Sequence, residues 1–172
     1  MVHRVSELMS AEVWTCHASH PMSRAAELMW NHDCGAVPVV EDSGELVGIV
    51  TDRDLCMAAY TRGQALHDMP LRSLCERELV TCVPDDSIAE AERKMVRFQV
   101  RRLPVIDGER RVVGMLTLSD LVRHLAIVSP EDGGGFSPRS LALTLEAVSR
   151  PRSAPGEAEI VARQSDALAK RS

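Results

Sequence analysis

Apolar and polar residues follow one another in a pattern that occurs twice in the N-terminal three quarters of the chain. Two short apolar segments, residues 36–40 and 46–50, are joined by turn-forming residues, and the same arrangement returns at residues 103–106 and 111–116. Two apolar segments joined by a short turn predict a β-hairpin. All matching positions lie 66 residues apart, and no gap is needed from residue 8 to residue 121. The chain therefore contains one structural unit used twice.

A segment with helical spacing of apolar residues precedes each hairpin. In the second copy, Ile88, Ala91 and Met95 form an apolar stripe, and the sequence from Ser87 to Glu90 is typical of a capping box at a helix start. The first copy has an equivalent stripe, which consists of Met22, Ala25, Ala26 and Met29. Both segments are predicted to be helices that turn one face toward a core.

A second helix is predicted after each hairpin, starting at Thr51 in the first copy and at Thr117 in the second. Segments near residues 13–16 and 79–83 contain β-branched residues and predict a short strand at the start of each copy. Each unit then reads strand, helix, strand, strand, helix. Because such a unit is too small for a generous core of its own, we expect an α+β fold in which two β-α-β-β-α repeats pack as one module.

The repeat pattern also predicts the domain boundaries. We place the first repeat at residues 5–62, the second at residues 70–127, and a linker with a C-terminal tail at residues 128–172. The linker is predicted because the sequence becomes rich in Gly, Pro and Ser after Val128.

The tail is predicted to contain one short helix. This helix is expected to begin near Ser140, with an apolar side formed by Leu141, Leu145 and Val148. Since the rest of the tail is polar, we expect it to lie at the periphery of the module.

The composition limits the class of protein. The 172 residues include 45% hydrophobic but only 3% aromatic side chains, so the core must consist mainly of aliphatic residues and methionine. No apolar run approaches the roughly 18 residues that a membrane span needs, and the N-terminus has no apolar stretch of the signal-peptide type. Five cysteines without a C-x-x-C spacing indicate reduced thiols. We therefore expect a cytoplasmic protein that does not act at a membrane.

The net charge of −5 is unevenly distributed along the chain. Residues 1–66 carry four Lys/Arg against nine Asp/Glu, whereas residues 67–130 carry ten of each. Neither part has the basic excess of a nucleic-acid-binding domain, so nucleic acid is not an expected partner. The arginines of the second copy suffice for a local anion site.

Both copies carry one chemical motif, Gly-x-x-Thr-x-x-Asp-Leu, from Gly48 to Leu55 and from Gly114 to Leu121. A threonine at a strand-to-helix turn presents its hydroxyl and the first helical amide groups to an anion. An aspartate three positions later can accept hydrogen bonds from both hydroxyls of a ribose. The glycines would let a base lie close to the sheet. Thr-x-x-Asp is also a helix capping box, and the two uses do not exclude each other.

With a proline in the first strand of each hairpin (Pro38 and Pro104) and this motif in both copies, residues 5–126 resemble a tandem pair of cystathionine-β-synthase (CBS) domains. The resemblance is closest to stand-alone bacterial two-repeat proteins. It implies a disc-like regulatory module that binds adenine nucleotides or related adenosyl ligands in clefts between the repeats and signals in trans. It also implies a flat homodimer formed through the helices, with Met22, Met29 and Met95 partly in the interface.

The candidate nucleotide-binding residues belong to two clefts. Those of the first cleft are Thr51, Arg53, Asp54, Ala36 and Val37, and those of the second are Thr117, Asp120, Arg101, Arg102 and Leu103. The residues before each proline would contact the base through apolar side chains and main-chain groups, and the arginines would reach a phosphate. Because the second cleft has the less acidic surroundings, we predict that it binds a phosphate-bearing ligand better.

Two other classes of function stay open. One is a ligand-free dimerisation or scaffold module whose tail helix docks an unidentified protein partner. The other is a zinc- or redox-responsive module, because Cys16, His17, His20 and Cys34 carry zinc-ligand atoms, although their spacing matches no zinc finger or ribbon. An enzyme is not expected, since the chain lacks a nucleophile elbow, a P-loop, an H-E-x-x-H sequence and a dinucleotide fingerprint. We expect no catalytic cofactor, and an adenine nucleotide as the ligand.

Overall fold

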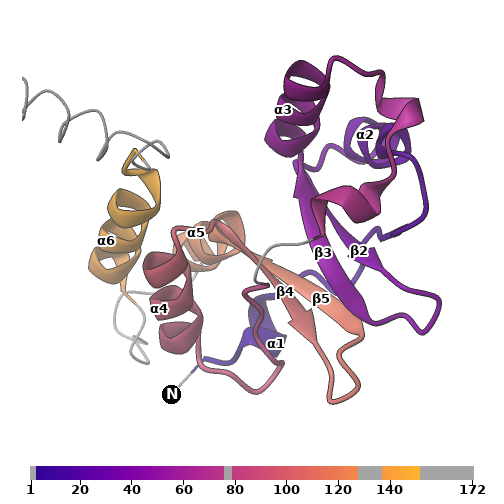
Figure 1. The fold of residues 1–172 in the computed structure, drawn as a ribbon. Helices are drawn as coiled ribbons and strands as arrows, with labels where there is room; N and C mark the ends of the chain where they lie inside the picture. Colours follow the sequence, from indigo (N-terminus) through magenta and orange to yellow (C-terminus); the bar gives the residue numbers. More distant parts are fainter. Residues whose placement is uncertain (1–2, 76–78, 128–136, 152–172) are drawn as a thin grey trace, which may run out of the picture.

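A computed structural model of the chain describes residues 3–75, 79–127 and 137–151. It shows helices and strands in two similar halves that lie side by side (Figure 1), which confirms the predicted α+β fold. The first half contains β1 (Cys16–His17), α2 (Met22–Asn31), β2 (Ala36–Val40), β3 (Leu46–Thr51), α3 (Asp52–Arg62) and the 3-10 helices η1 (Leu66–Asp68) and η2 (Leu71–Leu74). The second half contains α1 (Val5–Leu8), α4 (Ile88–Phe98), β4 (Arg102–Ile106), β5 (Val112–Thr117), α5 (Leu118–Ile127) and α6 (Pro138–Ser149).

The two predicted hairpins are present in the same register. Val39 pairs with Gly48 in the antiparallel pair β2–β3, and Val105 pairs with Gly114 in β4–β5. Strand β1 adds a parallel neighbour to β2. At the equivalent place in the second half, the described residues form an isolated parallel bridge between Cys82 and Val105. The second of the two predicted leading strands is thus reduced to one bridge.

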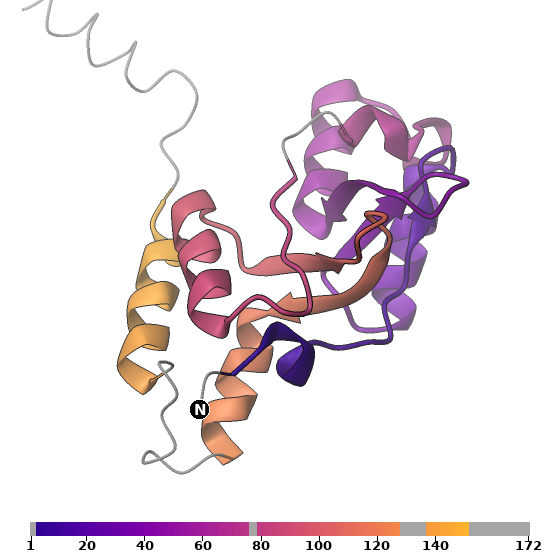
Figure 2. The ribbon, with the colours of Figure 1, turned by 90° about the horizontal axis from the view of Figure 1, so that it is seen from below.

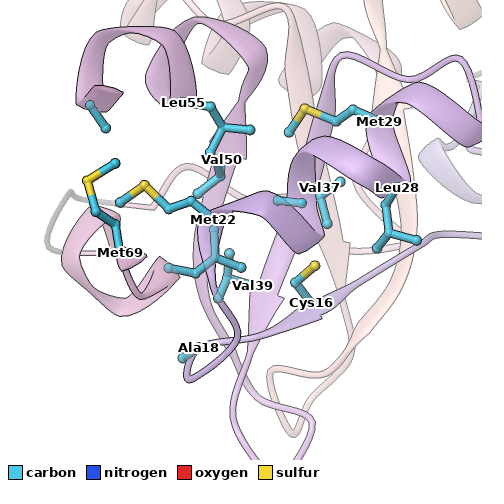
Figure 3. Packing of buried hydrophobic residues seen from close by; sticks show 13 residues of the cluster. Cys16, Ala18, Met22, Leu28, Met29, Val37, Val39, Val50, Leu55 and Met69 are labelled. Carbon is cyan, nitrogen blue, oxygen red and sulfur yellow. The ribbon is translucent and has the colours of Figure 1, made fainter. Parts of the chain in front are cut away.

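Helices α2 and α3 pack on the first hairpin and close its core. Met22, Val37 and Leu55 belong to the buried cluster that Figure 3 shows between these elements. Met22 is fully buried and Met29 is 7% exposed, and Met95 is fully buried in the second half. The prediction that these three methionines lie partly in a dimer interface is wrong, because the chain's own cores enclose them.

The first helix of the chain belongs to the core of the second half. Val5 of α1 is fully buried there, and Leu71 of η2, 66 residues later, is fully buried in the first half. The Ser10 amide then donates to the Met115 carbonyl of β5 at 2.9 Å, and Figure 2 shows α1 beside β5 and α5. The segment at the start of each repeat therefore completes the core of the other repeat.

Helix α6 confirms the predicted tail helix but corrects its buried face. Leu141, Thr144 and Val148 are buried against α4 and α5 (Figures 1 and 2), whereas Leu145 is 49% exposed. Thr144 lies one turn from both buried apolar residues, so it takes the place expected for Leu145. The helix closes the second core and is not peripheral, and its buried face is not available for docking a partner.

The rest of the predicted linker and tail, residues 128–136 and 152–172, lies outside the described residues. Within the described part of the chain, no helix has both the length and the apolar character that crossing a bilayer requires.

Candidate functional site

Each Thr-x-x-Asp sequence forms a hydrogen-bonded turn at the start of a helix. Asp54 Oδ2 accepts bonds from the Thr51 amide at 3.0 Å and the Thr51 hydroxyl at 2.7 Å, and the Asp54 amide donates back to that hydroxyl at 3.3 Å. Thr117 and Asp120 repeat this arrangement at 2.7, 2.6 and 3.2 Å. The capping interpretation is therefore confirmed at both turns, and a ligand can use only what capping leaves of the two carboxylates.

The second turn carries an additional ion pair. Arg123, three residues after Asp120 in α5, donates from Nη2 to Asp120 Oδ1. The Asp120 side chain is 5% exposed, whereas that of Arg123 is 68% exposed. The equivalent position in the first repeat holds Met57, which carries no charge. Arg123 is not among the candidate residues predicted from the sequence, although an Asp and an Arg three positions apart on a helix are a known ion-pair spacing.

Arg102 lies at the boundary between the two repeats. A Cβ placed on Gly35 would lie 2.8 Å from Arg102 Nη2 and 3.7 Å from Asp52 Oδ2. Asp52 also lines, together with Arg53 and Cys56, a hollow of about 330 Å³ that is open to solvent. Arg102 is predicted from the sequence to belong to the second cleft, but its guanidinium group lies beside residues of the first repeat. The structure thus gathers charged groups from both repeats near the start of α3.

The apolar candidates next to the prolines belong to the cores. Val37 and Leu103 are fully buried, and Ala36 is 9% exposed. Burial of Val37 and Leu103 makes their main-chain groups the better candidates for contact with a base, and the role of all three residues in binding stays a prediction. Arg101 is exposed, and its carbonyl accepts a hydrogen bond from the Leu118 amide at 2.9 Å.

The motif glycines do not leave room for a base. A Cβ on Gly48 would lie 2.7 Å from Cys75 Sγ, and a Cβ on Gly114 would lie 2.5 Å from Met9 Sδ. A base cannot lie on the side that a Cβ would occupy, because the segment at the start of the other repeat already fills that space. Met9 and Cys75 are themselves 66 residues apart, so the repeat offset was a signal that could have identified this pair.

The four candidate zinc ligands do not converge on one point. Cys16 lies in the first core, where burial raises the pKa of its thiol. The rings of His17 and His20 are 5.8 Å apart, and His17 Nε2 lies 3.0 Å from the exposed Asp42 carboxylate, while Cys34 Sγ lies 4.0 Å from a backbone carbonyl of α2. No three His, Cys, Asp or Glu side chains in the described ranges are placed to hold a metal ion. The zinc alternative therefore gains no support from this geometry.

A comparison with protein families decides what these repeats are. The family model described as CBS domain matches residues 5–60 and again residues 71–127. The chain belongs to the CBS domain family. It is also similar to the CBS domain-containing protein YhcV of Bacillus subtilis, with 36% identity over 117 residues, which cover 68% of this chain and 81% of that protein.

Solved structures of other CBS pairs share the fold. The CBS domain pair of protein MJ0100, in complex with 5′-methylthioadenosine and S-adenosyl-L-methionine, has a TM-score of 0.66 at 26% identity and covers 73% of this chain and 98% of its own. The structure of Hypoxic Response Protein I, with two coordinated zinc ions, has a TM-score of 0.66 at 32% identity and covers 72% of this chain and 99% of its own.

Some curated enzymes also match this CBS pair. The matched part is only 22–24% of each of those enzymes. Because the match is confined to the CBS region, it does not support an enzymatic role for this chain.

Proposed function

We propose that this CBS pair is a regulatory module that binds an adenine nucleotide or a related adenosyl ligand between its repeats and signals in trans to a protein partner. The observation that carries the proposal is the position of Arg102. This cation of the second repeat lies beside Gly35 and Asp52 of the first, next to Arg53 and the hollow. The start of α3, with the Arg102 guanidinium group nearby and Arg53 in its first turn, offers cationic groups to an anion such as a phosphate, and the Asp52 carboxylate opposes part of this attraction. The adenosyl ligands bound by the MJ0100 pair support the nucleoside part.

Residues of both repeats take part in this proposed site. Asp54 is the proposed ribose contact of the first cleft and Asp120 that of the second, and Arg53 and Arg102 are the proposed phosphate contacts of the first cleft. Because Arg53 and Arg102 come from different repeats, a ligand that binds both favours one arrangement of the module, which a partner can sense. The higher affinity of the second cleft stays a prediction, and a cytoplasmic location stays part of the proposal.

The test is a thermal-shift panel with AMP, ADP, ATP, S-adenosylmethionine and NAD on the wild-type chain. A ligand at about a hundred times its Kd stabilises the folded state by roughly 2.7 kcal/mol, which raises Tm by several degrees. The same panel on Asp54→Ala and Asp120→Ala assigns the shift to a cleft. No shift of the wild-type chain with any of the five ligands would overturn the proposal and favour the ligand-free scaffold module.

A matched control separates loss of binding from loss of a helix cap. Ser87 and Glu90 form the same capping box at the start of α4, with the Ser87 amide and hydroxyl donating to Glu90 at 2.9 and 2.7 Å. Glu90→Ala therefore removes an equivalent cap outside the proposed site. We expect it to lower Tm, as the aspartate variants do, because a helix cap is lost, and to leave the ligand-induced shift unchanged.

We also propose that the module is a homodimer, formed through the helices of the first repeat. Trp30 at the end of α2 is 87% exposed, and Tyr60 and Met57 on α3 are 80% and 46% exposed. Large aromatic side chains are enriched in protein interfaces, and this chain has only five aromatic residues of the Phe, Trp and Tyr type. A second copy of the chain is the proposed occupant of this face.

A further inference from the structure

The carboxylate of Asp120 is almost saturated with hydrogen bonds before any ligand binds. Its Oδ2 accepts from the Thr117 amide and hydroxyl, and its Oδ1 accepts from Arg123. A carboxylate offers about four acceptor positions, two on each oxygen. Three of these positions are therefore taken. One ribose hydroxyl can still bind, but two hydroxyls can bind only if Arg123 leaves Oδ1.

Arg123 is able to move away from Asp120, but its guanidinium group then needs another anion as a partner. Its side chain is 68% exposed and lies at the surface of α5, so rotation is not blocked by packing. The carboxylate that it leaves is 5% exposed, and charge-assisted bonds at such a group are stronger than neutral ones. An uncharged nucleoside offers a diol to Asp120 but nothing to the displaced guanidinium group. A nucleotide offers both, because its 5′-phosphate belongs to the same ribose as the diol.

The first repeat carries a different residue at the position of Arg123. Met57 stands at the position equivalent to Arg123, and it can form no ion pair with the carboxylate of its own turn. The difference between Met57 and Arg123 thus predicts that the two clefts differ in their preference for ligands.

We infer that Arg123 is a specificity-determining residue that makes the second cleft select phosphate-bearing nucleosides over uncharged ones. Arg123 pairs with Asp120, and in this proposal it transfers to the ligand phosphate when the ribose diol takes its place. This inference rests on the proposed function, since it concerns the ligand class of the same site. This exchange involves only hydrogen bonds and ion pairs, and no covalent bond forms or breaks.

The experiment compares AMP with adenosine by isothermal titration of the full chain. An Asp54→Ala background isolates the second cleft, and Arg123→Met gives it the residue of the first repeat. We expect the background chain to bind AMP at least about tenfold more tightly than adenosine, as one charge-assisted bond allows. In Arg123→Met, AMP should bind more weakly and adenosine more tightly, so that their affinity ratio falls about tenfold.

Two further variants distinguish a specific role from a change of net charge. Arg123→Lys keeps the charge and should retain part of the preference for AMP. Arg93→Met removes a charge from the exposed part of α4 and should leave the ratio unchanged. The inference is overturned if Arg123→Met leaves the AMP-to-adenosine ratio unchanged while Asp120→Ala abolishes binding, and the proposed function then survives. If neither AMP nor adenosine binds the wild-type chain, the titration overturns both the inference about Arg123 and the proposed function for these two ligands.

Discussion

Glu92 of α4 and Thr144 of α6 are joined by a buried hydrogen bond, in which the Thr144 hydroxyl donates to the Glu92 carboxylate at 3.2 Å. Glu92 is 6% exposed, and burial raises the pKa of its carboxyl above the ordinary 4.5 although hydrogen bonds from Thr144 and Ser140 oppose the shift. Burial therefore penalises the charged form of this side chain. We therefore expect the contact between α4 and α6 to depend on the ionisation state of Glu92.

The first prediction concerns the pH dependence of this contact. With a raised pKa in the folded chain, Glu92 contributes most stability below pH 4.5, and the contribution is lost as the pH rises through the raised value. Glu92→Gln removes the buried charge, so it should stabilise the chain at pH 8 by about 1 kcal/mol, or 2–4 °C in Tm, and by less at pH 4.5. Thermal melts at the two pH values measure both effects.

A control on the same helix should show the opposite sign. Glu90 is exposed, and its hydrogen bonds with Ser87 lower the pKa of its carboxyl. Its contribution is therefore present above its ordinary pKa and is lost as the pH falls, so Glu90→Gln should destabilise the chain at pH 8. Equal effects of Glu92→Gln at pH 4.5 and pH 8 would contradict the assignment to ionisation.

The second prediction concerns the exchange of segments between the repeats. In Gly114→Ala the new Cβ would lie 2.5 Å from Met9 Sδ and 3.2 Å from the Ser10 carbonyl oxygen. Such crowding of a packed contact typically costs about 1–3 kcal/mol, which denaturant unfolding measures. Met9→Ala should recover part of this loss in the double variant, because it removes the nearest atoms. Additive losses in the double variant would show that Met9 does not occupy this space.

The hairpins and capped helices were predictable because their signals are local. The register of Val39 with Gly48, and the box of Ser87 and Glu90, depend on residues close together in the sequence. The position of Val5 in the core of the second half could not be predicted from local signals. Its burial depends on a contact with residues more than eighty positions away, such as the Val5 amide with the Asp86 carbonyl at 2.9 Å.

In the candidate site, too, local contacts were predictable from the sequence and long-range contacts were not. The pairing of Thr51 with Asp54 is a three-residue contact, and its spacing alone predicted it. The placement of Arg102 beside Gly35 depends on how the two repeats pack, which no periodicity expresses. Burial of Val37 was predictable in principle, because a continuous apolar run indicates a strand buried on both faces.

The third prediction concerns the proposed homodimer. If a second copy covers the exposed face of α2 and α3, Trp30→Glu with Tyr60→Glu should convert the dimer to a monomer, because two buried charges would lie in the interface. Light scattering after size-exclusion chromatography gives the mass directly. Leu143→Glu, which changes an exposed leucine on α6, is the control and should leave the dimer intact. Dissociation by Leu143→Glu alone would place the interface on the second half.

The fourth prediction concerns the reactivity of the thiols. Cys56 is exposed on α3 and lines the hollow with Arg53, whereas burial raises the pKa of the Cys82 thiol to about 12 and also raises those of Cys16 and Cys75. Because the thiolate is the reactive form, Cys56 should react fastest with a disulfide reagent at pH 7.5, and Cys56→Ser should remove the fast phase.

The same reaction reports on the proposed first cleft. A nucleotide that binds over Arg53 should shield Cys56 and slow its modification at saturating concentration, and Asp54→Ala should abolish this protection. Glu90→Ala, which removes a helix cap outside the site, should retain it. A fast phase that persists in Cys56→Ser would assign it to another thiol. Unchanged protection in Asp54→Ala would show that the ligand does not depend on the first Thr-x-x-Asp turn.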